Sequence, residues 1–200
     1  MKVVVVDSPV ANLTSISSAL RAVGAEAEVT ADPARIESAG RIVLPGVGAF
    51  PAAMAWLDAS EVAPALRSAS TRGASILGIC LGMQLLFERS NEEQPTRGLA
   101  LIEGEVVPLS NELPLPLVGW NRVVCNGDPL FAGVGSPADF YFVHSYRVVP
   151  GGGTNVIATA SYGGDYPAAV RRGRISGVQF HPEKSSAAGL RLLANFLELS

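Results

Sequence analysis

The first 90 residues alternate short apolar runs with segments of helical pattern, and this alternation limits the fold more than any other feature. Four consecutive valines at 3–6 are typical of a strand buried on both faces of a sheet. Further apolar runs predict strands at 27–30, at 41–44 (ending before Pro45 and Gly46) and at 75–79, and helical patterns predict helices at 13–23, 52–57, 63–71 and 81–89. Such alternation predicts a doubly wound α/β fold, in which helices cover both faces of a mainly parallel sheet.

The second half of the chain has a different pattern, with short β-rich segments separated by Gly, Pro and Asp. These segments predict an antiparallel extension of the parallel sheet, followed by a closing helix at 185–199. No repeat, low-complexity tract or long linker divides the sequence, so we expect residues 1–200 to form a single domain. The expected strands are 106–108, 119–125, 140–149, 155–161, 168–172 and 175–180.

Charge and hydropathy exclude several classes of function. The net charge is −3 and no basic stripe occurs, which argues against nucleic acid as a partner. The longest apolar stretch, 76–87, falls well short of the roughly 20 residues that a membrane span needs, and the N-terminal valines are too few for a signal peptide. The two cysteines, Cys80 and Cys125, are too few for a disulfide framework. We therefore expect free thiols and a cytoplasmic protein.

Cys80 lies where an expected buried strand meets an expected helix, with glycines two residues before and two residues after it. The serine version of this G-x-C-x-G pattern is the nucleophile elbow, a tight turn in which glycines prevent steric collisions. The N-terminus of the following helix favours a thiolate, and the Leu81 N–H can donate to an oxyanion. An isolated cysteine is often only a core residue. The glycine spacing and the strand-to-helix change favour a nucleophile instead.

A thiolate nucleophile needs a base and a group that orients this base, and the chain has two histidines. His181 ends an expected strand, and Glu183 follows close enough to fold back on its imidazole. His144 lies inside a strand pattern with no acid nearby in sequence, which favours a structural role. The sequence therefore predicts a Cys80–His181–Glu183 triad that hydrolyses an amide through a thioester, without a cofactor or metal.

A second glycine-containing loop, 45–50, follows the third expected strand. It is neither a Rossmann fingerprint nor a P-loop, because the required third glycine and the Gly-Lys-Ser/Thr are missing. Closely spaced glycines can present backbone N–H groups to an oxyanion, and a plain glycine turn is the alternative. Together with Cys80, the pattern favours an oxyanion loop with Val47 and Gly48 as donors.

Two of these motifs match a known family. Gly-Ile-Cys-Leu-Gly-Met-Gln at 78–84 and Gln-Phe-His-Pro-Glu at 179–183 resemble the two signatures of class I glutamine amidotransferases. Further segments are similar to one branch of that family, the glutaminase subunits of imidazole glycerol phosphate synthase, and the resemblance spans essentially the whole chain. These segments are 45–50, 83–88, 119–121, 141–146 and 180–185.

This resemblance implies more than the residues show by themselves. It implies hydrolysis of glutamine to glutamate and ammonia, and a heterodimer with a TIM-barrel cyclase subunit that takes up the ammonia and activates the glutaminase. The cyclase products would be imidazole glycerol phosphate and aminoimidazole carboxamide ribotide, in histidine biosynthesis. The implied contacts of glutamine are Gln84, Glu92, Ser145 and Tyr146, and the implied partner-facing residues are Asn12, Trp120, Tyr141 and Lys184.

The segment 8–11 departs from the glycine-richer pattern of the family, which weakens interface roles for this loop.

Three alternatives stay open at this level. Trp120 and Tyr141 could equally be core aromatics. A glutaminase of another pathway, such as anthranilate or pyridoxal phosphate synthesis, would share the triad, although 119–121 and 141–146 argue against it. A flavodoxin-like scaffold without catalysis would need no triad at all.

Overall fold

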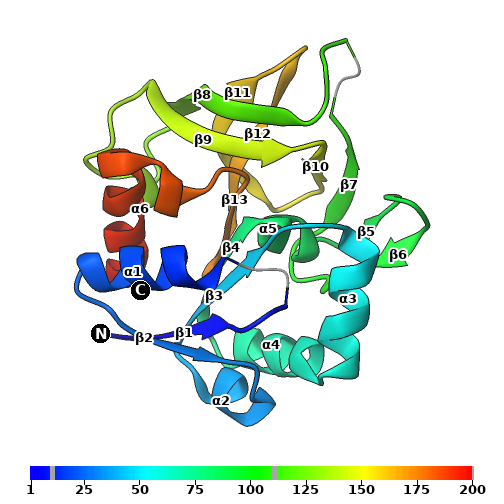
Figure 1. Ribbon diagram of the computed structural model, residues 1–200, viewed down its shortest axis with the longest axis vertical. Coiled ribbons are helices and arrows are strands. Elements are labelled where there is room, and N and C mark those ends of the chain that lie inside the picture. The colour runs from blue at the N-terminus through cyan, green and yellow to red at the C-terminus, as the bar shows by residue number, and fades with distance from the viewer. Residues whose placement is uncertain (10–11, 110–111, 200) are drawn as a thin grey trace.

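The computed structural model describes residues 1–9, 12–109 and 112–199 (Figure 1). The described residues form a nine-stranded sheet in the order β2-β1-β3-β4-β13-β12-β11-β8-β9. From β2 to β13 all neighbours are parallel, and from β13 to β9 all are antiparallel. The predicted parallel core with its antiparallel extension is therefore confirmed. The strands are β1 (Lys2–Val6), β2 (Glu26–Thr30), β3 (Arg41–Gly46), β4 (Ser75–Cys80), β8 (Leu117–Cys125), β9 (Ala138–His144), β11 (Asn155–Ser161), β12 (Asp165–Arg172) and β13 (Ile175–Val178).

Helices cover both faces of the parallel strands, as the sequence predicts (Figure 1). On one face, α1 and α6 pack against the inward side chains of β1, β3 and β4. On the other face, α2, α3, α4 and α5 enclose the second core cluster. The helices are α1 (Leu13–Ala22), α2 (Pro33–Ser38), α3 (Phe50–Ala59), α4 (Val62–Thr71), α5 (Leu81–Leu85) and α6 (Ser186–Glu198).

A four-stranded sheet, formed by the described residues beside the α3–α5 layer, was not expected from the sequence. Its order is β10-β7-β5-β6, where β5 is Arg89–Ser90, β6 is Thr96–Arg97, β7 is Gly104–Pro108 and β10 is Tyr146–Pro150. The single strand predicted at 140–149 is wrong for this reason. His144 pairs with Leu117 in the large sheet, whereas Tyr146 pairs with Pro108 in the small one. The chain therefore changes sheets at Ser145.

Several element boundaries differ from the prediction. The helix expected at 81–89 ends at Leu85, because the carbonyl groups of Leu85 and Leu86 accept hydrogen bonds from Leu99 and Leu101. The strand β3 continues through Gly46 instead of ending before Pro45, since its ladder with β4 pairs Gly46 with Cys80. Helix α2 was not expected from the sequence; it begins after the N-cap Asp32, whose side chain accepts a hydrogen bond from the Ala34 N–H.

Within the described residues, none of the helices is both long and apolar enough to cross a membrane.

Candidate active site

Cys80 is the last residue of β4 and has a backbone conformation that side-chain-bearing residues rarely adopt, with φ 55° and ψ −113°. The neighbouring glycines explain how the turn is accommodated. A Cβ atom at Gly78 would lie 2.5 Å from the Gly82 carbonyl oxygen, and one at Gly82 would overlap the Leu44 carbonyl oxygen. Strained backbone of this kind is concentrated at functional sites, where the surrounding structure holds it in place. The observed turn matches the elbow predicted from the glycine spacing.

The helix after the turn is shorter than the sequence argument assumed. Since α5 spans five residues, its dipole contributes less than that of a full helix. Leu81, the first residue of α5, directly follows Cys80, and first-turn N–H groups such as that of Leu81 have no partner inside the helix. Within α5, local N–H donors rather than a long helix dipole can therefore stabilise negative charge.

His181 and Glu183 form a buried pair, with 2.9 Å between Nδ1 and Oε1 and side-chain exposures of 7% and 4%. The backbone holds the histidine from both sides. Its N–H donates to the Tyr141 carbonyl, and its carbonyl accepts from the Ser185 hydroxyl. Because a carboxylate only accepts, Nδ1 carries the proton and the other ring nitrogen is left for the sulfur.

The electrostatics of His181 favour its charged form. Burial lowers its pKa, but hydrogen bonding and charge interaction with Cys80 and Glu183 outweigh burial and raise the pKa to about 10. A histidine held as imidazolium beside a cysteine can stabilise the thiolate and supply a proton to a leaving group.

Gln179 contacts the Cys80 sulfur, a role that was not expected from the sequence. Its side-chain amide nitrogen lies 3.8 Å from Sγ of Cys80, while its amide oxygen accepts from Gln84 at 3.1 Å. Gln84 also donates to the Tyr146 carbonyl at 3.2 Å. Its position could have indicated this role, because Gln179 lies two residues before His181 and both directly follow the end of β13.

Cys80 lines a cleft of about 240 Å³. The structure brings to this cleft all of the residues that the sequence predicted for the oxyanion and for the substrate. The predicted residues in its lining are Cys80, Val47, Gly48, Leu81, Gln84, Glu92, Ser145 and Tyr146. His181 and Glu183 instead line a small cavity beside Pro45 and Gly46, which shares Val47 with the cleft.

His144 also lines the cleft, which the sequence did not indicate. Its Nδ1 lies 2.8 Å from the Tyr146 carbonyl, and its ring packs against Phe142 and Tyr166. Burial lowers its pKa to about 4, so the ring is neutral at neutral pH. These contacts suit the structural role predicted for His144.

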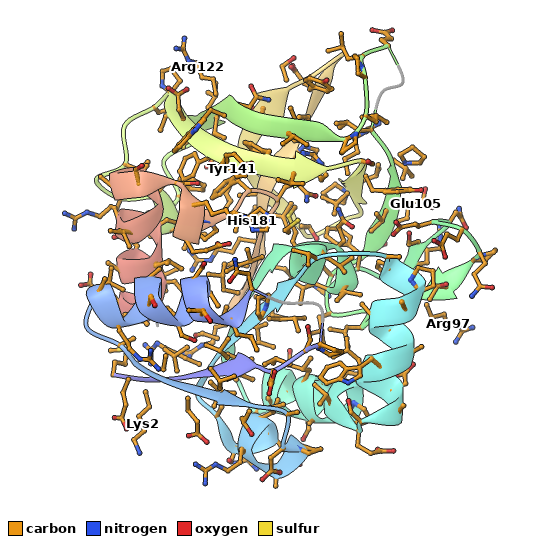
Figure 2. The ribbon with its side chains drawn as sticks, in the orientation of Figure 1. Lys2, Arg97, Glu105, Arg122, Tyr141 and His181 are labelled. Carbon is orange, nitrogen blue, oxygen red and sulfur yellow. The ribbon has the colours of Figure 1, made fainter. Side chains whose placement is uncertain are left out.

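Three of the residues predicted to face a partner lie together, with Trp120 and Lys184 exposed and Tyr141 half-buried. Trp120 is 55% exposed, which excludes the alternative of a core aromatic, and it packs edge-on against Tyr141 at 6.1 Å between ring centroids. Lys184 places Nζ 5.6 Å from the centre of the Tyr141 ring. In Figure 2, Tyr141 lies next to His181, so this cluster borders the His181–Glu183 pair.

Asn12 is separate from that cluster. Its side chain caps α1 by accepting from the Ser15 N–H at 3.3 Å, and it lines the small cavity that contains His181 and Glu183. Val10 and Ala11, two of the four residues of the unusual segment 8–11, lie outside the described residues, so the expected effect of this segment stays a prediction.

No group of three or more His, Cys, Asp or Glu side chains that could hold a metal ion occurs among the residues that the structure describes.

Comparison with solved structures supports the fold. The chain is similar to the structure of PurLQS from Thermotoga maritima, with a TM-score of 0.79, 22% identity and coverage of 98% of this chain and 97% of that one. It is also similar to a glutamine amidotransferase from Thermotoga maritima, with a TM-score of 0.70, 14% identity and coverage of 99% of this chain and 83% of that one.

Sequence comparison is more specific. The family model for glutamine amidotransferase class-I matches residues 4–199. The imidazole glycerol phosphate synthase subunit HisH of Symbiobacterium thermophilum is 49% identical over 196 residues, covering 98% of this chain and 92% of that protein. The subunits of the same name from Moorella thermoacetica and Synechococcus elongatus are 45% and 46% identical, with coverage of 98% of this chain and 94% and 92% of those proteins. The chain therefore belongs to the class I glutamine amidotransferases and, within them, to the HisH subunits of imidazole glycerol phosphate synthase.

Proposed function

We propose that Cys80, His181 and Glu183 hydrolyse the side-chain amide of glutamine and that the released ammonia is used by a cyclase subunit. The observation that carries this proposal is the strained Cys80 turn with the buried His181–Glu183 pair beside it. A nucleophile, a base and an orienting carboxylate in this arrangement are the minimum for amide hydrolysis through a covalent intermediate.

The reaction would proceed in two steps. The Cys80 thiolate attacks the γ-carbonyl carbon, and N–H groups of Leu81 and of the Val47–Gly48 segment stabilise the oxyanion. Protonated His181 gives its proton to the amide nitrogen, the C–N bond breaks, and ammonia leaves behind a γ-glutamyl thioester. Neutral His181 then takes a proton from water, whose oxygen attacks the thioester, and glutamate and the thiolate are released. Glu183 holds the imidazole in the required tautomer through Nδ1.

The remaining residues of the cleft would bind the amino-acid end of glutamine. Glu92 offers a carboxylate to the substrate ammonium, and Ser145 and Tyr146 offer polar groups to the substrate carboxylate. The side-chain nitrogen of Gln84 already donates to Gln179 and Tyr146, so its amide oxygen would accept a hydrogen bond from the ammonium. The carboxylate of Glu92 is partly buried, which strengthens such a pair relative to one in water.

The partner proposed for this chain is a TIM-barrel cyclase subunit, in a heterodimer of histidine biosynthesis. Apolar side chains exposed on one side of β8 and β9 support a docking surface there, because contiguous exposed apolar patches mark interaction sites. We call this surface the β8–β9 face, and it consists of the exposed Val118, Trp120, Val124 and Val143 together with the half-buried Tyr141. Its place beside His181 would give ammonia a short path to the partner. One domain over 1–200 and a cytoplasmic location stay predictions, the former supported by the sheet that joins both halves of the chain.

Glutamine labelled with ¹⁵N in its side chain tests this function. We expect slow release of labelled ammonia from the chain alone. With the cyclase subunit and its nucleotide substrate present, we expect much faster turnover and label in the imidazole product. Labelled ammonia added to the cyclase without this chain is the control, and its label should enter the same product. Activation by a synthase of another pathway, but not by the cyclase, would contradict the assignment.

Removing the Trp120 side chain should weaken association with the cyclase while the fold stays intact. A large exposed aromatic in the centre of such a face is the typical hot spot, and its loss costs about 2 kcal/mol, or roughly 30-fold in Kd. Titration calorimetry of Trp120→Ala checks this value. Lys2→Ala is the control, because Lys2 is exposed at the opposite end of the molecule (Figure 2). Equal affinities for both variants would contradict docking through the β8–β9 face.

A further inference from the structure

The helix α3 begins directly after the glycine loop and lacks a local cap. Its N-cap residue is Ala49, which has no polar side-chain atom, and Pro51 in its first turn has no N–H group to satisfy. The first N–H groups of a helix have no partner inside it, and they need an acceptor from elsewhere. The Phe50 N–H is such a group, and the Phe50 side chain is fully buried.

Glu92 supplies that acceptor from 42 residues away in the sequence. Its Oε2 accepts the Phe50 N–H at 2.8 Å. Glu92 is held in turn by its own N–H, which donates to the buried Ser90 hydroxyl at 3.1 Å. A carboxylate at a helix N-terminus also has a favourable interaction with the helix dipole. The contact is therefore a remote cap that fixes the start of α3 to the β5–β6 hairpin, which lies beside α3 in Figure 1.

This cap determines where the glycine loop ends. At the other end of the loop, Gly46 is fixed because it pairs with Cys80 in the β3–β4 ladder. Between the two fixed points lie three residues, Val47, Gly48 and Ala49, and Gly48 has φ 96°. Their N–H directions depend on where both ends are held. Glu92 lines the same cleft as Val47, Gly48 and Cys80, so its carboxylate faces the substrate while it holds the loop.

We propose that Glu92 is a positioning residue for the oxyanion loop, which it holds through the Phe50 N–H, in addition to any contact with substrate. This inference rests on the proposed glutaminase activity. Oε2 binds the backbone, and Oε1 is left for the substrate ammonium, so occupation of the cleft and the position of the loop are linked through one side chain. A residue that only recognised the ammonium would affect binding alone, whereas a positioning residue also affects the rate of the chemical step.

Two variants separate these roles in the complex with the cyclase subunit. Glu92→Gln loses the charge that pairs with an ammonium but keeps an amide oxygen that can accept from Phe50, whereas Glu92→Ala loses both. We expect Glu92→Gln to raise KM for glutamine about 10-fold while kcat changes little. Glu92→Ala should raise KM similarly and also lower kcat at saturating glutamine by about 10-fold or more, since small misplacements of catalytic groups have large effects on rate.

Glutaramate, which lacks the α-amino group, removes the ammonium contact from the comparison. With this substrate Glu92→Gln should lose less activity relative to the wild type than Glu92→Ala does, because only the glutamine side chain can still accept from the Phe50 N–H. Exchange of the Phe50 amide hydrogen, followed by NMR, should accelerate in Glu92→Ala and not in the control Glu93→Gln, an exposed neighbour. Equal kcat values for Glu92→Ala, Glu92→Gln and the wild type with saturating glutamine would overturn the positioning role. Absence of glutamine turnover in the wild-type complex would instead refute the proposed function itself.

Discussion

Cys80→Ser should lower glutamine hydrolysis at least about a thousandfold, because removal of the nucleophile from a triad removes most of its catalysis. The serine oxygen is a smaller and much weaker nucleophile than a thiolate at neutral pH. The residues around Cys80 are also spaced and charged to suit a sulfur atom. His181 is held as imidazolium by Cys80 and Glu183, and Gln179 lies 3.8 Å from Sγ, a distance suited to sulfur rather than to oxygen.

The appropriate measurement is ammonia release at saturating glutamine in the complex with the cyclase subunit, together with mass spectrometry of the trapped thioester. Cys125→Ser is the matched control, since Cys125 is the other thiol of the chain and lies on β8, where burial raises its pKa. We expect this control to keep near-wild-type activity and to form the thioester. Detection of a thioester in Cys80→Ser, or its loss in Cys125→Ser, would show that Cys80 is not the nucleophile.

The parts of the site that the sequence predicted are those encoded locally. The turn at Cys80 needs glycines at 78 and 82, and the His181–Glu183 pair lies within three residues of chain, so both leave a pattern in the sequence. The parallel core was predictable for a similar reason, since strands buried on both faces consist of continuous apolar runs such as 3–6.

The parts that could not be predicted depend on contacts between distant segments. The early end of α5 follows from backbone bonds to Leu99 and Leu101, and no residue near 85 signals it. The change of sheets at Ser145 depends on which strands flank it, because the sequence from 140 to 149 is uniformly β-forming. The remote cap of α3 by Glu92 likewise joins residues 42 positions apart. Local propensity contains no information on such pairings.

Gly82→Ala should have the second large effect, a loss of at least about 3 kcal/mol in the free energy of unfolding. Alanine in a helix is otherwise favoured over glycine by about 1 kcal/mol, so propensity alone predicts the opposite sign. The close approach of α5 to β3 decides the sign. A Cβ atom at this position would overlap the carbonyl oxygen of Leu44, which is backbone in the middle of a parallel sheet and cannot move aside as a side chain could.

Gly40→Ala is the matched control for this substitution, since its Cβ would meet nothing within 4 Å, and we expect its stability to stay within about 0.5 kcal/mol of the wild type. Denaturant unfolding of both variants gives the comparison. The consequences of Gly82→Ala should extend to activity, because Leu44 leads directly into the loop that contains Val47 and Gly48, and Gly82 follows Cys80 by two residues. We expect a shift that relieves the overlap to move Cys80 relative to the Val47–Gly48 segment, which are the proposed nucleophile and oxyanion donors. A Gly82→Ala protein with wild-type stability and wild-type kcat would therefore contradict both the packing of α5 on β3 and the placement of the oxyanion site between them.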